Sequence, residues 1–167
     1  QLCAPEDMRL LCRGFSRYYD DVIIDCPAGV GQGFRTAVAG AEAALVVTTP
    51  DMVCARDAQV VGHLLFARDL PARLIINRLR PEMIARGDMM SVDDVTEILA
   101  VNLLGTILDD EQIVIATNQG EPLSGKSSQA EEEYRNICQR IIGENVPFMN
   151  IAERKSFFRK IGNMFRK

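Results

Sequence analysis

The order of short and long hydrophobic patterns along the chain restricts its fold more than any other feature. Short runs rich in β-branched residues alternate with longer segments of helical periodicity. This alternation is typical of a parallel sheet with helices on both faces. The connections that follow the carboxyl ends of such strands usually carry the functional groups. We expect strands over residues 21–26, 44–49, 73–77 and 103–108, and helices over residues 6–18, 34–41, 55–68, 91–101, 111–118 and 127–142.

Composition adds limits on size and environment. With 167 residues, 47% of them hydrophobic, the chain suits one α/β domain over residues 1–149, followed by a polar hinge over 150–155. The five cysteines form no C-x-x-C pair, so we expect neither a disulfide framework nor a zinc site. No signal peptide or transmembrane run is evident, which predicts a cytoplasmic protein, and a chain that starts at Gln1 predicts a fragment.

Residues 156–167 form an amphipathic pattern. At about 100° per residue their large apolar side chains share an arc of about 120°, while the basic side chains lie outside it and no acid is present. This pattern predicts a helix that lies in the interface of an anionic membrane and is too short to span it. Packing of the same stripe on the protein's own core is the alternative. The residues expected to bind the membrane are Phe157, Phe158, Arg159, Lys160, Ile161, Met164, Phe165, Arg166 and Lys167.

The distribution of charge supports the membrane hypothesis. Residues 153–167 carry six basic residues and one acid, a net of +5, which leaves −9 on the preceding residues of a chain whose net charge is −4. An acidic body with a basic, apolar tail is typical of a peripheral membrane protein. The negative body argues against a nucleic-acid partner.

The first predicted strand ends in an acid that a glycine soon follows. Val22-Ile23-Ile24-Asp25 precedes Cys26-Pro27-Ala28-Gly29-Val30-Gly31. In phosphoryl-transfer proteins an acid at a strand tip holds Mg²⁺, and a nearby glycine lets a backbone N–H approach the γ-phosphate. A strand that simply ends in a turn of Asp, Pro and Gly explains the same residues. Taken alone, this segment leaves both interpretations open.

Further motifs follow in a recognisable order. They are Thr48-Thr49-Pro50-Asp51, Arg56-Asp57, Asn77-Arg78, the ten residues from Arg86 to Val95, and Asn118-Gln119-Gly120-Glu121-Pro122. From about residue 20 to residue 167 the chain resembles the deviant-Walker-A ATPases of the MinD/ParA group. The later motifs and the terminal helix are similar to those of the MinD branch of that group.

This resemblance implies a P-loop NTPase-like fold and an ATPase that uses ATP and Mg²⁺. It implies that Asp25 is the Walker B residue that holds Mg²⁺ through water and that Gly29 is the switch II phosphate sensor. It also implies that Asn77 and Arg78 lie on the adenine side of the nucleotide site. The Asn77 amide offers both a donor and an acceptor to a base, although an Asn that satisfies the local backbone explains it as well. Arg56 and Asp57 are an exposed pair or part of a partner or dimer interface.

The resemblance also implies partners and a location. It implies an ATP-dependent homodimer on the cytoplasmic face of the inner membrane, which recruits MinC to inhibit septum formation and acts with MinE or a topological-specificity partner. Two other classes remain open, a partition ATPase of the ParA type and a non-enzymatic membrane adaptor. The acidic body and the aromatic tail count against the partition ATPase.

The sequence departs from the group in two places. The Gly-rich loop with its two lysines and the switch I acid do not occur before Asp25. We therefore expect an incomplete fold that corresponds to about the C-terminal three-fifths of such a protein. We also expect that this chain alone neither binds ATP tightly nor hydrolyses it. Gly31 stands where related proteins usually carry an acid.

Residues 120–127 match the P-loop pattern G-x-x-x-x-G-K-[ST]. A P-loop needs a buried strand before it, and we expect a helix there. We therefore interpret residues 120–127 as a connecting loop.

Overall fold

A three-stranded parallel sheet organises the part of the chain that the computed structural model describes, residues 3–148. The strands β1 (Ala44–Thr48), β2 (Ala72–Leu79) and β3 (Leu103–Leu108) lie in the order β1-β2-β3. The helices described are α1 (Pro5–Phe15), α2 (Gln32–Gly40), α3 (Met52–Phe66), α4 (Pro81–Arg86), α5 (Val92–Leu99), α6 (Glu111–Gln119) and α7 (Gln129–Ile141). The α/β class and the last three predicted strands are confirmed.

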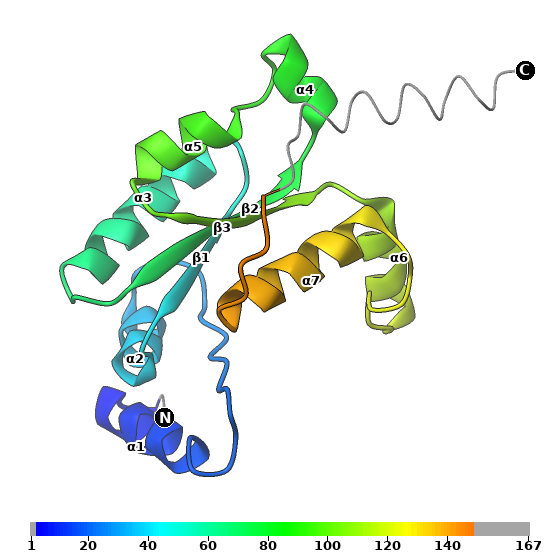
Figure 1. The fold of residues 1–167 in the computed structure, drawn as a ribbon. Coiled ribbons are helices and arrows are strands. Elements are labelled where there is room, and N and C mark those ends of the chain that lie inside the picture. The colour runs from blue at the N-terminus through cyan, green and yellow to red at the C-terminus, as the bar shows by residue number, and fades with distance from the viewer. Residues whose placement is uncertain (1–2, 149–167) are drawn as a thin grey trace, which may run out of the picture.

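Both faces of β2 are buried, as its continuous apolar run predicts. Leu74 and Ile76 are completely buried on the face that α3 and α5 cover, while Ile75 faces Ile137 of α7 on the other side. Figure 1 shows α3 and α5 on one side of the sheet and α7 on the other. The sheet is therefore the middle layer of three.

The second face of the sheet is covered over β2 and β3 but not over β1. The apolar cluster beneath α7 takes its buried side chains from β2, β3 and α7. On β1, Leu45 and Val47 remain 50% and 58% exposed. An apolar surface thus continues past the edge of the layer that α7 provides.

The predicted strand over residues 21–26 is wrong for the described structure. This segment is irregular and connects α1 to α2, and Ile23 is 94% exposed. Its β-branched residues favour an extended backbone, but a strand also needs a neighbour that accepts and donates ladder hydrogen bonds. None of the strands in residues 3–148 pairs with this segment.

Local capping explains where the helices begin. Asp51 accepts a hydrogen bond from Cys54 N at 2.9 Å, so α3 starts three residues before the predicted position. At α5, Ser91 Oγ accepts from Asp94 N at 3.1 Å and Asp94 accepts from Ser91 N at 2.8 Å, and together they form a capping box. The short helix α4 was not predicted, because its six residues are too few for a periodic pattern.

The expected amphipathic helix at residues 156–167 and the hinge at 150–155 lie outside the described residues. Between residues 3 and 148, every helix is too short or too polar to cross a membrane.

Candidate functional site

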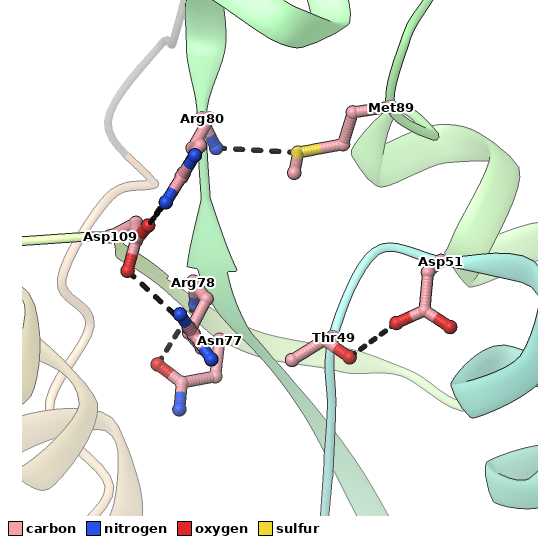
Figure 2. A network of polar contacts seen from close by, with 7 residues as sticks. All are labelled: Thr49, Asp51, Asn77, Arg78, Arg80, Met89 and Asp109. Atoms are coloured by element: carbon pink, nitrogen blue, oxygen red, sulfur yellow. Dashed lines mark hydrogen bonds and ion pairs between the residues drawn. The ribbon is translucent and has the colours of Figure 1, made fainter.

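The polar residues that follow the three strands meet at one edge of the sheet. Because the strands are parallel, the turns after their carboxyl ends lie side by side. Thr49 and Asp51 follow β1, Asn77 and Arg78 lie near the end of β2, and Asp109 directly follows β3. Figure 2 shows these side chains together with Arg80 and Met89.

Arg78 has an unusual backbone conformation that involves Asn77. Its φ is +59°, in the left-handed region that non-glycine residues rarely adopt. The Oδ1 atom of Asn77 accepts a hydrogen bond from Arg78 N at 2.9 Å, and the register between β2 and β3 shifts between Ile76 and Leu79. The Nδ2 amide of Asn77 donates no hydrogen bond within residues 3–148. Asn77 thus satisfies the backbone with its oxygen and keeps its amide donor available to a ligand.

Asp109 joins two arginines across the same edge. Its carboxylate forms ion pairs with Arg80 and, at 3.4 Å, with Nε of Arg78. Arg80 also donates its backbone N–H to the sulfur of Met89 at 3.4 Å. Hydrogen bonding from Arg80, reinforced by the charges of Arg80 and Arg78, lowers the pKa of Asp109 below its ordinary value. The carboxylate therefore holds both guanidinium groups next to Asn77.

The sequence analysis missed Asp109 and Arg80. A usable signal was present, because Asp109 immediately follows a correctly predicted strand and Asn77 lies near the end of the neighbouring one. Parallel strands bring such positions to one edge. The ion pairs themselves join residues 29 and 31 positions apart in the sequence, so no local pattern reveals them.

The Asp109 ion pairs predict acid sensitivity. The folded-state pKa of Asp109 is depressed, so its contribution to stability is complete above the unfolded pKa of about 3.9 and is lost as the pH falls through the folded value. We expect Asp109→Asn to cost about 0.5 to 1 kcal/mol near neutral pH and almost nothing near pH 2. Urea midpoints across that range measure this difference, and an equal cost at both ends would contradict the assignment.

Asp51 serves the start of α3. It accepts from Cys54 N and, at 2.5 Å, from the hydroxyl of Thr49, and these hydrogen bonds, that of Cys54 first, lower its pKa. The Asp51 carboxylate is thus committed to positioning the backbone after β1.

An open hollow of about 490 Å³ lies between Asp51 and the loop from α4 to α5. Met52, Met89 and Met90 line this hollow.

The residues predicted for the phosphate side do not form a complete site. Asp25 and Gly29 lie exposed in the irregular segment before α2, and no hydrogen bond or ion pair in the described part of the chain joins them to Asn77 or Arg78. Gly29 has a φ of +84°, which a glycine adopts without strain. Within residues 3–148 no three acidic, histidine or cysteine side chains gather as a metal site. One exposed carboxylate does not by itself hold Mg²⁺, so the described residues do not form a complete magnesium site.

The P-loop-like residues 120–127 have the geometry of a connecting loop. They lie between α6 and α7, so a helix and not a strand precedes them. Lys126 forms an ion pair with Glu121, and α7 begins only after Ser128, whose hydroxyl accepts from Glu131 N at 3.1 Å. This arrangement agrees with the interpretation of the motif as a loop.

Arg56 and Asp57 lie on the outer side of α3. Both side chains are exposed, and the exposed Val53 and Val60 lie one turn before and one turn after them. Positions i, i+3, i+4 and i+7 share one face of a helix. We call Val53, Arg56, Asp57 and Val60 the α3 strip.

A parallel sheet between two helical layers, with polar and charged side chains at its carboxyl edge, defines a doubly wound α/β fold, a class in which ligands bind at that edge. No family model matches the sequence. Two septum site-determining MinD proteins do match it. The MinD of Bacillus subtilis is 40% identical over 166 residues, which are 97% of this chain and 62% of the relative. The MinD of Synechocystis is 46% identical over 148 residues, which are 87% of this chain and 56% of the relative. Over nearly its whole length, this chain is similar to septum site-determining MinD proteins.

Solved structures show the same similarity. The MinC:MinD cell division protein complex of Aquifex aeolicus contains a chain that is 33% identical, with a TM-score of 0.82 over 87% of this chain and 62% of that one. The Pyrococcus horikoshii MinD complexed with Mg-ADP is 24% identical, with a TM-score of 0.74 over 83% and 57%, and shows the shared fold. The chain spans about three-fifths of the length of the curated relatives that it matches.

Proposed function

We propose that this chain is part of a MinD-type ATPase that takes part in placing the division site. The identity to the Bacillus MinD over nearly the whole chain carries this proposal. The carboxyl edge adds support, because its donors and positive charges suit a purine nucleotide. In the proposed whole protein, bound ATP with Mg²⁺ supplies the phosphoanhydride that is hydrolysed.

The chain's own residues would take separate parts in that function. Asn77 offers its Nδ2 amide to the adenine edge, while its Oδ1 keeps the Arg78 backbone in place. Asp25 would lie near the magnesium ion and Gly29 near the γ-phosphate once segments outside this chain provide the phosphate-binding loop. We expect this chain alone to be inactive.

A chimera tests the proposed activity. The part of the Bacillus MinD that this chain does not match is joined to this chain, and phosphate release from ATP is measured. We expect hydrolysis that Asp25→Ala lowers by at least about 100-fold, because it removes a charged group beside the metal. Lys126→Ala is the matched control and leaves the rate unchanged, since Lys126 pairs with Glu121 in a connecting loop.

Two outcomes would contradict this assignment. If Lys126→Ala removed activity and Asp25→Ala did not, residues 120–127 would be the phosphate-binding loop. If a folded chimera showed no hydrolysis, the non-enzymatic adaptor would be the better account.

We further propose that the protein attaches reversibly to the cytoplasmic face of the inner membrane through residues 156–167. A single short helix contributes a few apolar side chains and about 1 kcal/mol per basic residue near an anionic surface, which gives marginal binding. Two helices on an ATP-dependent dimer gain from effective concentration, by about 10²-fold or more. Hydrolysis, triggered by MinE or a topological-specificity partner, would separate the dimer and release both helices.

The α3 strip is the surface that we propose for MinC. It combines two exposed apolar side chains with a charged pair, a mixture that suits a protein partner. We expect Val60→Asp to weaken capture of the Bacillus MinC by the chimera by at least about tenfold. Val114→Asp on α6, also an exposed valine, is the matched control, and equal effects of the two changes would contradict the assignment.

A further inference from the structure

We propose that Arg140 anchors the start of the C-terminal segment and so fixes the point from which the tail leaves the domain. The anchor itself stands on the described residues alone. Its consequence for membrane binding rests on the proposed attachment through residues 156–167.

The guanidinium group of Arg140 ties three parts of the chain together. From the end of α7 it donates through Nη1 to Leu104 O of β3 at 3.0 Å, through Nε to Val146 O at 3.0 Å and through Nη2 to Pro147 O at 2.9 Å. The ring of Phe148 lies 4.4 Å from its central carbon, close enough for a cation–π interaction. One side chain therefore holds the last described segment against both a helix and a strand.

The position of Arg140 is itself fixed by close packing of α7 on β3. A Cβ atom at Gly105 would come within 2.4 Å of Ile137 and 3.3 Å of Nη1 of Arg140, so only glycine permits this approach. Near the other end of β3, Glu133 of α7 accepts a hydrogen bond from Leu108 N at 2.7 Å. The helix is thus attached near both ends of the strand, and Arg140 has a firm base.

The hydrogen-bonding pattern requires arginine. A planar guanidinium offers five donors in a fixed fork, whereas a lysine ammonium is a single point with no fixed plane. Burial, together with the charge of Arg73, lowers the pKa of Arg140, yet arginine stays charged in proteins. Arg140→Lys therefore keeps the charge and loses the three-carbonyl geometry.

Release of the anchor would add residues 145–148 to the connection between the domain and residues 156–167. The turn after α7 is held without Arg140 as far as Glu144, whose N–H donates to Gln139 O at 2.9 Å. Counted up to residue 156, the connection would therefore grow from seven residues to eleven. Effective concentration falls with about the 3/2 power of linker length, which predicts about a twofold loss in the binding of a dimer to a membrane.

A tryptophan at position 148 reports on the anchor directly, because the sequence contains no tryptophan. Phe148→Trp preserves a ring for Arg140 and provides a single fluorophore. Because Phe148 is already 54% exposed, we expect Arg140→Lys in this background to raise the acrylamide quenching constant by less than twofold, but beyond the error of the measurement. Arg135→Lys is the matched control, an exposed arginine on α7 that pairs with Glu131, and leaves quenching unchanged. Equal quenching in the parent, the variant and the control, with all three folded by circular dichroism, would overturn the anchor.

The membrane consequence is measured on the full chain fused to a dimerising module. The probe is vesicles of equal parts phosphatidylglycerol and phosphatidylcholine. We expect Arg140→Lys to weaken sedimentation of the dimer about twofold and to leave the monomer unchanged. Increased quenching without weaker sedimentation of the dimer would overturn the positioning role of Arg140. If the parent dimer did not bind the vesicles at all, the proposed membrane attachment would be refuted. In that case the quenching result alone would decide whether Arg140 is an anchor.

Discussion

Phe158→Glu is expected to remove binding of the chain to anionic vesicles. Phe158 lies within the apolar arc of residues 156–167, where burial of such a ring contributes about 1.5 to 3 kcal/mol. The introduced carboxylate is also repelled by the lipid headgroups, at about 1 kcal/mol per charge. Together these effects predict at least about a 100-fold loss in co-sedimentation with phosphatidylglycerol vesicles.

The matched control for this prediction is Asn163→Glu. It introduces the same charge on the polar side of the same predicted helix, so we expect a loss of only about fivefold. A chain that ends at Arg154 should not bind at all. Equal binding by Phe158→Glu and the parent would show that the stripe packs on the body of the protein.

Ile76→Ala is expected to produce the largest loss of stability. Ile76 is completely buried in the middle of β2, between the layers of helices. Removing most of a buried isoleucine costs about 2 to 5 kcal/mol, through lost burial and the cavity left behind. The change in urea midpoint measures this cost, provided that the slope of the transition is unchanged.

Two further variants make this prediction specific. Ile76→Val removes one methylene and should cost about 0.5 to 1.5 kcal/mol. Val60→Ala, on the exposed outer side of α3, should change stability by less than about 0.5 kcal/mol. A cost below about 1 kcal/mol for Ile76→Ala would contradict the burial of this face of β2 beneath α3 and α5.

The sequence predicted the three paired strands because their information is local. Runs such as Leu74-Ile75-Ile76 are apolar on consecutive positions, as buried parallel strands require. Residues 21–26 show a similar pattern but remain irregular, because strand formation also depends on a pairing partner that no local pattern reveals. Pairing is a property of the whole sheet.

The candidate site was predicted in part for a similar reason. Asn77 and Arg78 lie at the carboxyl edge where the order of motifs indicated, and the rejected P-loop match at residues 120–127 is a loop after a helix. Asp109 and Arg80 were missed, because their ion pair joins residues 29 positions apart in the sequence. The roles assigned to Asp25, Gly29, Asn77 and Arg78, and the tail at residues 156–167, stay predictions.

Membrane attachment through paired tails is the central claim of the proposed function. The most direct test compares the monomeric chain with the same chain fused to a dimerising module, on vesicles with and without phosphatidylglycerol. We predict that dimerisation increases binding to the anionic vesicles by at least about 10²-fold and leaves binding to neutral vesicles weak. A gain below about twofold, or equal binding to both kinds of vesicle, would contradict it.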